Sequence, residues 1–298
     1  MAQVSHLRIG ITIGDAAGIG PEIVAAALQS PALPGCEFVV IGEHPACRPG
    51  QPTPETARAA AAALEEAVAT ALRGELAAIV TGPIHKARMY EIGFPFPGQT
   101  EFFAKRCGVE NFAMLLTGGK LTVALVTTHI PLCRVPEVLS QKEVVRVGGL
   151  LADFLRRRLA RAPRIAVAGL NPHAGESGAL GTEETALIAP AIAELNTIHH
   201  SPSTDHEFFT GPFSPDTIFH HAVAGDWDGV LCMYHDQGLI PLKLHAFHEG
   251  VNVTLGLPFP RTSPDHGTAF EIAGKGIARP DSMLAAIKLA VELAARPE

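Results

Sequence analysis

The sequence predicts an α/β protein of two lobes built around mostly parallel sheet. Short apolar runs alternate with helical patterns along the chain, and this alternation is typical of parallel strands joined by helices. The chain has 298 residues and exceeds a typical domain of ~100–200 residues, which favours two lobes over one. Its 29 glycines and 24 prolines indicate many tight connections between short elements.

The first lobe is expected to begin with a strand over Leu7–Ile13. The glycine-rich turn Gly14–Gly20 then leads into a helix near Pro21, because proline suits a first helical turn. An alanine-rich helix is predicted over Thr56–Leu72, where Ala and Leu recur at helical spacing. Buried strands are expected on either side of this helix in the sequence, over Phe38–Gly42 and Ala77–Val80.

The same alternation continues along the rest of the chain. Further strands are expected over Phe112–Thr117, Leu121–Thr127, Arg164–Ala168, Gly229–Met233 and Val251–Leu255. Helices are expected over Gln141–Arg158, Thr182–Leu195 and Asp281–Ala295. The second of these opens with Glu183 and Glu184, which suit the positive end of a helix. Between Asn196 and Gly211, the run His199–Pro202 is expected to be a surface loop with His199 and His200 exposed.

The composition favours small-molecule chemistry in a compact globular protein. Apolar residues make up 47% of the chain, charged residues 18%, and the formal net charge is −7. The basic residues are scattered, as at Arg156–Arg158, so the chain lacks the concentrated positive face that a nucleic-acid-binding protein needs. No apolar run reaches the ~18 residues of a membrane-spanning helix, so no membrane partner is expected.

The cysteines indicate a reducing compartment. They are odd in number and widely spaced, and they form no C-x-x-C pair. Residues 1–14 are typical of a strand rather than of a basic segment followed by a long apolar one. We therefore expect a soluble, cytoplasmic protein with reduced thiols at Cys36, Cys47, Cys107, Cys133 and Cys232.

Three histidines stand in loop-like tracts that each follow an apolar run. They are His129 in Thr127–Pro131, His173 in Asn171–Glu176 and His235 in Met233–Gly238. Imidazole is a common ligand of zinc and related ions, and three protein ligands with an open position are typical of a catalytic metal site. The gaps of 44 and 62 residues fit no zinc finger, so such ligands would converge from the ends of different strands. Three unrelated turn or core histidines are the alternative.

A set of cationic and polar residues could hold an anionic substrate. Arginine and lysine are the usual means of binding phosphate or carboxylate, and Lys243 stands among apolar neighbours, which favours a pocket over an exposed surface. The candidates are His85, Lys86, Thr100, Lys243, Asn252 and Arg261.

Several common nucleotide and hydrolase motifs are absent. The turn Gly14–Gly20 lacks the G-x-G-x-x-G spacing of a standard dinucleotide fingerprint, and no convincing acidic ribose ligand follows it. There is no G-x-S-x-G elbow, P-loop or H-E-x-x-H helix, which disfavours elbow hydrolases, P-loop NTPases and zincins. The polar segment Asp265–Gly276 reads as an irregular loop.

Taken together, these tracts resemble the 4-hydroxythreonine-4-phosphate dehydrogenase family of pyridoxal phosphate biosynthesis. The resemblance spans nearly the whole chain, and many ordered motifs carry it. The strongest are Gly14–Pro21, Thr81–Lys86, Pro97–Phe103, Thr127–Leu132, Leu170–Glu184, Met233–Gly238 and Asn252–Glu271.

The resemblance implies two α/β/α lobes of the isocitrate and isopropylmalate dehydrogenase type, with the active site in the cleft between them. The first would comprise residues 1–97 and 257–298. The second, residues 98–256, would carry the dimer interface and most ligands of the metal and substrate. The family forms a homodimer with its active site at the subunit interface, so a metal could draw ligands from both chains.

The resemblance also implies roles for individual residues. The metal ligands would be His129, His173 and His235, holding one divalent zinc, magnesium or cobalt ion. The substrate would contact Gln99, Thr100, Lys243, Asn252 and Arg261. Gln99 is a departure, because the family usually has histidine there, and an amide carries no charge near neutral pH.

The segment from His266 to Gly276 looks like the adenosine-contacting loop of isopropylmalate and isocitrate dehydrogenases. NAD or NADP would then contact His266, Gly267 and Thr268, and this mode of binding explains the missing fingerprint.

The implied reaction is oxidation of 4-phosphooxy-L-threonine to 2-amino-3-oxo-4-phosphooxybutanoate, which loses carbon dioxide to give 3-amino-2-oxopropyl phosphate. The metal would act as the electrophile, and the cationic set would hold the phosphate and carboxylate. Asp236 would orient its neighbouring ligand or help with proton transfer, with a simple turn residue as the alternative.

Other activities stay open from the sequence. One is oxidation of another phosphorylated hydroxy acid, such as a phosphoerythronate or phosphothreonate, or of an aromatic cis-dihydrodiol carboxylate. The others are a metal-dependent hydrolase or lyase and a non-catalytic sugar-phosphate binder.

Overall fold

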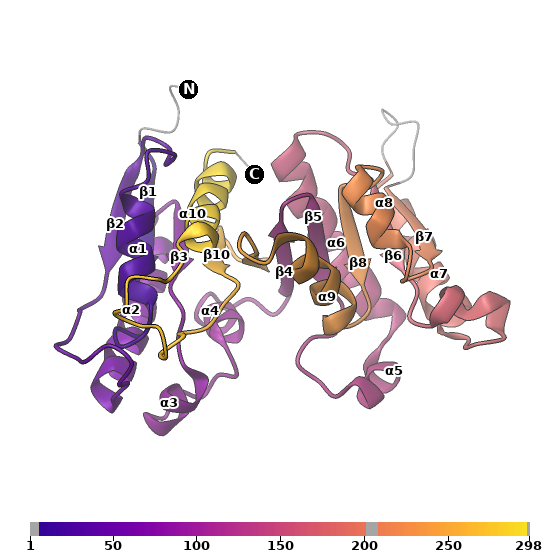
Figure 1. Ribbon diagram of the computed structural model, residues 1–298. Helices are drawn as coiled ribbons and strands as arrows, with labels where there is room; N and C mark the ends of the chain where they lie inside the picture. The colour runs from indigo at the N-terminus through magenta and orange to yellow at the C-terminus, as the bar shows by residue number, and fades with distance from the viewer. Residues whose placement is uncertain (1–5, 201–207, 297–298) are drawn as a thin grey trace. The chain divides into compact units, whose positions relative to one another are not determined.

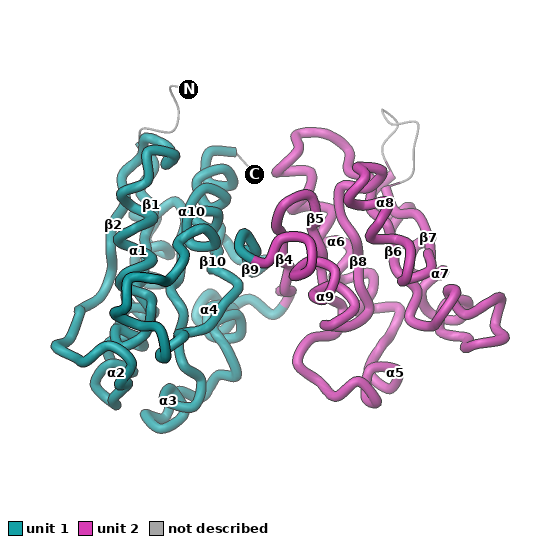
Figure 2. Tube along the Cα trace, in the orientation of Figure 1, with its two compact units in different colours: residues 1–110, 248–297 teal, residues 111–247, 298 magenta. Residues whose placement is uncertain are grey.

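The computed structural model describes residues 6–200 and 208–296. Its contacts divide this chain into two compact units (Figure 2). The first unit comprises residues up to 110 and from 248 onward, and the second comprises Asn111–Phe247. The sequence predicted the divisions after residues 97 and 256; contacts instead group helix α4 (Gln99–Arg106) and strand β9 (Val251–Leu255) with the first unit.

The sheet of the first unit has the strand order β2-β1-β3-β10-β9. All neighbours in it are parallel except β9 and β10. In addition to β9, this sheet contains β1 (Arg8–Thr12), β2 (Glu37–Ile41), β3 (Ala78–Thr81) and β10 (Arg261–Pro264). In addition to α4, the unit contains the helices α1 (Gly20–Leu28), α2 (Pro54–Leu72), α3 (Lys86–Glu91) and α10 (Asp281–Ala294).

The core of the first unit explains why α4 belongs to it. Phe102 and Phe103 of α4 are fully buried and pack in one cluster with Leu64 and Val68 of α2 and Ile79 of β3. Burying a side chain of this size contributes ~1.5–3 kcal/mol. The helix that begins at Gln99 is therefore anchored firmly, and so are the polar residues at its start.

The sheet of the second unit has the order β4-β5-β8-β6-β7 (Figure 1). Strands β4 and β5 form an antiparallel hairpin, and the other neighbours are parallel. The strands are β4 (Ala113–Gly118), β5 (Leu121–Leu125), β6 (Ile165–Ala168), β7 (Phe209–Phe213) and β8 (Gly229–Cys232). The longer helices are α6 (Gln141–Leu159), α7 (Ala189–Ile198) and α9 (His235–Ala246), and short α5 (Val135–Val138) and α8 (Ile218–Ala224) accompany them.

Every strand predicted from the sequence is present, and so are the predicted helices. The helix predicted from Thr182 begins instead with one π-helical turn over Glu184–Ile188 before α7. Strand β2 was predicted to be buried, yet Val40 is 49% exposed, because β2 lies at the edge of its sheet. No helix in the described part of the chain has the length and apolar character that crossing a membrane requires.

The prediction of a surface loop over His199–Pro202 was wrong for His199. This side chain is 8% exposed and stacks on Phe208, with ring centroids 6.2 Å apart, while His200 is exposed as predicted. Burial, helped by nearby Arg156, lowers the pKa of His199. The other two residues of this run, Ser201 and Pro202, lie outside the described residues.

Candidate active site

The three predicted metal ligands follow three neighbouring parallel strands of the second unit. His129 follows β5, His235 follows β8 and His173 follows β6, and the sheet order places β8 between the other two. The carboxyl ends of parallel strands share one edge of a sheet, which is where open α/β sheets bind ligands. The sheet topology thus brings the three tracts to one edge, as the sequence predicted.

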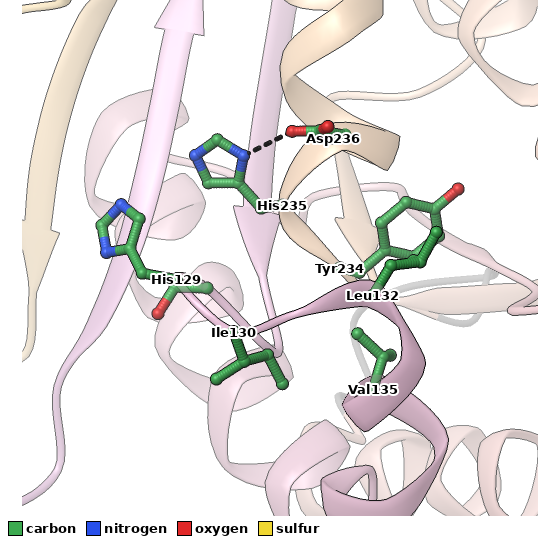
Figure 3. Close-up of a pocket in the computed structure, with 8 residues that line it drawn as sticks. His129, Ile130, Leu132, Val135, Tyr234, His235 and Asp236 are labelled. Atoms are coloured by element: carbon green, nitrogen blue, oxygen red, sulfur yellow. Dashed lines mark hydrogen bonds and ion pairs between the residues drawn. The ribbon is translucent and has the colours of Figure 1, made fainter.

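His129 and His235 come together at this edge. Their ring centroids are 5.4 Å apart, and they line a hollow of about 180 Å³ (Figure 3). One side of the hollow is apolar, since Ile130, Leu132 and Val135 face it. The site therefore combines two imidazoles with an apolar wall.

Asp236 orients the second imidazole. Its Oδ1 lies 2.7 Å from Nδ1 of His235. A carboxylate at Nδ1 fixes the ring orientation and leaves Nε2 available, which is the usual support for a metal-binding histidine. The Asp236 side chain is 68% exposed, and His235 is the first residue of α9.

Two buried polar side chains tie the strand ends to one another. Thr127 Oγ1 donates to the carbonyl of Met233 at 2.8 Å, which joins the end of β5 to the end of β8. Gln237 accepts from the N–H of Met233 at 2.6 Å and donates to the carbonyl of Gly169 at 2.7 Å, which joins β8 to the segment after β6. Because both ends of this amide are used, the strand ends that carry the histidines are held in register.

His173 lies on a left-handed turn. Residues His173–Ser177 all have positive φ, between 44° and 77°, and only Gly175 among them is glycine. The buried carboxylate of Glu184 holds the segment just before this turn. Its Oε1 accepts from the N–H groups of Leu170 and Asn171 at 2.8 and 2.7 Å, and its Oε2 accepts from the Asn171 amide at 3.0 Å.

One chain does not assemble the three histidines. Within residues 6–200 and 208–296, no three His, Cys, Asp or Glu side chains are grouped so that they could hold a metal ion. Two neighbouring imidazoles, one of them oriented by a carboxylate, fit part of a divalent metal site. His173 is not grouped with them.

Two predicted substrate residues, Gln99 and Thr100, lie close to Arg261 in the first unit. This guanidinium is 2% exposed; its Nη2 donates to Thr81 Oγ1 at 2.5 Å and to Gln99 Oε1 at 2.8 Å. Its Nη1 donates to Thr254 Oγ1 at 3.2 Å, and Thr254 lies 3.4 Å from Oγ1 of Thr100.

Arg261 is a buried cation held by neutral groups. It takes part in none of the ion pairs found among the described residues, and its Nε has no hydrogen-bond partner there. Burial lowers its pKa to about 9, although Glu101 acts in the opposite direction. A buried charge that forms no ion pair is unfavourable, and an anion that reached the guanidinium would relieve that cost.

Asn252 and Lys243 are the remaining predicted substrate residues. Asn252 lies in β9, where its buried Oδ1 has no hydrogen-bond partner among the described residues. Lys243 lies on α9 of the second unit.

The predicted cofactor segment contacts the glycine-rich turn of the first unit. The carbonyl of Thr268 accepts from the N–H of Ile19 at 2.9 Å, and Thr268 is buried while His266 and Gly267 are exposed. A Cβ at Gly18 would lie only 2.7 Å from that carbonyl, so this approach requires glycine. The predicted cofactor segment and the glycine-rich turn, which are far apart in the sequence, are therefore in contact.

Sequence reasoning missed four residues that support these sites. Thr81 and Thr254 hold Arg261, and Gln237 and Glu184 hold the strand ends. All four fall within the tracts that carry the family resemblance, yet nothing in the sequence indicated their hydrogen bonds.

The chain matches one protein family over most of its length. The profile of the family described as "Pyridoxal phosphate biosynthetic protein PdxA" matches residues 20–290. The chain is 42% identical to the 4-hydroxythreonine-4-phosphate dehydrogenase of Caulobacter vibrioides, and the alignment covers 97% of this chain and 98% of that protein. It is 38% identical to a 4-hydroxythreonine-4-phosphate dehydrogenase from Klebsiella pneumoniae whose crystal structure superposes with a TM-score of 0.83, covering 97% and 100% of the two chains.

More distant structures share the fold. A terephthalate 1,2-cis-dihydrodiol dehydrogenase from Burkholderia xenovorans is 26% identical, with a TM-score of 0.69 and coverage of 96% and 98%. Isocitrate dehydrogenase from Methylococcus capsulatus is 18% identical, with a TM-score of 0.52 and coverage of 96% and 85%. This second likeness concerns the fold alone and confirms the predicted fold class.

Proposed function

The chain belongs to the PdxA family of pyridoxal phosphate biosynthetic proteins, and we propose that it is a 4-hydroxythreonine-4-phosphate dehydrogenase. It would oxidise 4-phosphooxy-L-threonine with NAD or NADP to 2-amino-3-oxo-4-phosphooxybutanoate. Loss of carbon dioxide from this β-keto acid would give 3-amino-2-oxopropyl phosphate.

The observation that carries the proposal is the buried Arg261 guanidinium, which forms no ion pair among the described residues. Its neighbours Thr81, Gln99 and Thr254 hold it through neutral oxygens, so its positive charge stays available to an anionic substrate. Arginine binds phosphate and carboxylate strongly because its N–H groups match their oxygens in pairs. Asn252, with an unpaired buried acceptor, would add a contact to a substrate hydroxyl or ammonium group. Thr100 and Lys243 complete the proposed substrate-binding set.

His129 and His235 are the proposed metal ligands that this chain brings together. Their spacing and the Asp236 contact support the role. A divalent ion held there supplies a Lewis acid for the oxygen on which negative charge develops. Asp236 would keep the imidazole of His235 oriented throughout.

We propose that a second copy of the chain completes the metal site with His173, in a homodimer. Two observations support this: one chain groups no three suitable ligands among the described residues, and α9 exposes an apolar stripe. Ile240, Leu244 and the adjoining Phe247 are 65%, 88% and 69% exposed, and they recur at helical spacing. Apolar patches of this kind mark protein interfaces.

The nicotinamide cofactor is proposed to contact His266, Gly267 and Thr268. The close packing of Thr268 against the Gly14–Gly20 turn supports this, because backbone N–H groups at a helix start suit phosphate groups.

A cytoplasmic location completes the proposal, and the unpaired state of all five cysteines agrees with it.

Absorbance at 340 nm tests the proposal directly. Purified protein is mixed with 4-phosphooxy-L-threonine and NAD or NADP, before and after treatment with a chelator. NADH or NADPH should appear, should cease after chelation and should return with added Zn²⁺, Mg²⁺ or Co²⁺. Full activity after rigorous metal removal would exclude the metal role, and lack of product with either cofactor would exclude the reaction.

A second substrate class is favoured by one observation. The terephthalate dihydrodiol dehydrogenase shares the fold along nearly the whole chain, and Arg261 could bind a carboxylate as well as a phosphate. The same assay with a 4-phosphoerythronate, a phosphothreonate and an aromatic cis-dihydrodiol carboxylate ranks these substrates by kcat/KM. The proposed substrate should exceed each of them.

A further inference from the structure

The carboxamide of Gln99 is bonded to the protein at both ends. Its Oε1 accepts from Arg261 Nη2 at 2.8 Å, and its Nε2 donates to the carbonyl of Gly82 at 3.1 Å. These partners define which end of the amide is oxygen, because a flipped amide would point N–H groups at the guanidinium. Gln99 therefore links Arg261 to the segment that follows β3.

The backbone around this amide is fixed. Gln99 is the first residue of α4, and the next turn of that helix places Phe102 and Phe103 in the core of the first unit. The ring of Phe103 also lies 5.4 Å from the Arg261 guanidinium. The amide thus reaches Arg261 from a rigid support rather than from a mobile loop.

The neutrality of Gln99 matters as much as its position. A carboxylate at this distance would pair with Arg261 and offset the charge that an anionic ligand needs. An amide oxygen orients the guanidinium and leaves its charge intact. Thr81 and Thr254 act in the same way, since both accept through hydroxyl groups.

We propose that Gln99 is a positioning residue, which holds Arg261 in place for the anionic end of the substrate without contacting the reacting atoms. This inference rests on the proposed function, since it assigns Arg261 to substrate binding. It revises the role expected of Gln99 from the family resemblance, which was direct contact with the substrate.

Two substitutions of Gln99 separate positioning from other roles. Gln99→Met keeps the length of the side chain and removes both hydrogen bonds, so KM for 4-phosphooxy-L-threonine should rise about tenfold while kcat changes less than about threefold. Gln99→Glu keeps an acceptor but adds a charge that pairs with Arg261, so KM should rise about a hundredfold or more. Gln141→Met is the matched control, because Gln141 is also the first residue of a long helix and bonds only Glu194 among the described residues.

Sulfate binding measured by calorimetry provides a readout that needs no turnover. Sulfate stays dianionic across the working pH range, and its affinity should fall in the order wild type, Gln99→Met, Gln99→Glu. Gln141→Met should match the wild type. If Gln99→Met does not fold, Gln99→Asn carries the same test, because its shorter amide cannot span the gap to Arg261.

The possible results distinguish a failure of this inference from a failure of the proposed function. Absence of NADH with the wild-type protein would overturn the function, whereas the order of sulfate affinities would still judge Gln99. Sulfate or substrate binding by Gln99→Glu as tight as in the wild type would overturn the positioning role. A loss of kcat at unchanged KM in Gln99→Met would also overturn it, since it would assign Gln99 to the chemical step.

Discussion

The imidazole rings of His129 and His235, two residues that follow adjacent parallel strands, lie with their centroids 5.4 Å apart. His173 follows the next strand but is not grouped with them within one chain. This arrangement is the basis of our proposal that the three histidines bind one metal ion only when a second chain is present.

Mixing two inactive variants tests this sharing of ligands. His129→Ala and His173→Ala should each be inactive alone, since each lacks one ligand in every site. After the subunits are exchanged, the mixture should recover about a quarter of wild-type activity, because half of the dimers are mixed and each mixed dimer keeps one intact site of two. A mixture that stays inactive although mass spectrometry detects mixed dimers would contradict the shared site.

Removing the charge of Asp236 should weaken the metal site. In Asp236→Asn the imidazole of His235 loses its carboxylate partner, and Zn²⁺ affinity should fall about 10- to 100-fold. Calorimetry of the metal-free protein measures this directly. Asp153→Asn, an exposed substitution on α6, should bind Zn²⁺ like the wild type; equal affinity in both variants would mean that Asp236 is only a turn residue.

Replacing Arg261 by methionine should abolish substrate binding and leave the fold intact. Among residues 6–200 and 208–296 the guanidinium forms no ion pair, so its removal leaves no carboxylate buried without its partner. We expect kcat/KM to fall by about a hundredfold or more, with Tm within about 5 °C of the wild type. Calorimetric unfolding and steady-state kinetics check the two parts. Near-normal kcat/KM would remove Arg261 from the substrate site.

Glu184 should stabilise the second unit. In Glu184→Ala, two backbone N–H groups and the Asn171 amide lose an acceptor, which should lower the free energy of unfolding by about 2–4 kcal/mol. Urea denaturation followed by circular dichroism measures this change. The control is Glu194→Ala at an exposed position, for which a change below about 0.5 kcal/mol is expected. Equal stability of both variants would show that the loop does not depend on Glu184.

His199 should make the protein less stable in mild acid. Burial lowers its pKa in the folded state, so the unfolded chain binds the proton more readily. The contribution of His199 is therefore present above the unfolded pKa of ~6.5 and is lost as the pH falls, at no more than about 1.4 kcal/mol per pH unit. Thermal unfolding at pH 7.5 and 5.5 should show a smaller decrease for His199→Phe than for the wild type. The exposed His200→Gln should behave like the wild type, and identical decreases in all three proteins would refute this role.

The strands that carry the site could be predicted because they are short apolar runs bounded by turn residues. This holds for β5, β6 and β8, and the histidines after them could be located from the same pattern. Strand β7 was missed because Gly211 and Pro212 interrupt its pattern, which an edge strand tolerates. Helix α9 was missed because Gly238 and Pro241 look like turn residues, although both lie within it.

The surroundings of Arg261 could not be predicted from local pattern. Its hydrogen-bond partners come from residues 81, 99 and 254, on two strands and a helix. The misjudged burial of His199 has a similar cause, because the aromatic neighbour at Phe208 lies across a connection that reads as polar. Periodicity reports which face of an element is apolar, and it does not report which polar groups meet in the interior.

The left-handed turn at His173–Ser177 fixes the position of His173 in a backbone conformation that costs folding free energy. Four of its five residues carry a Cβ in a region of φ that costs an ordinary residue ~1–2 kcal/mol. The sum is comparable with the total stability of many domains, ~5–15 kcal/mol. Because a side chain at His173 is kept in this conformation at a cost in folding free energy, the turn agrees with the proposed role of His173 as a metal ligand.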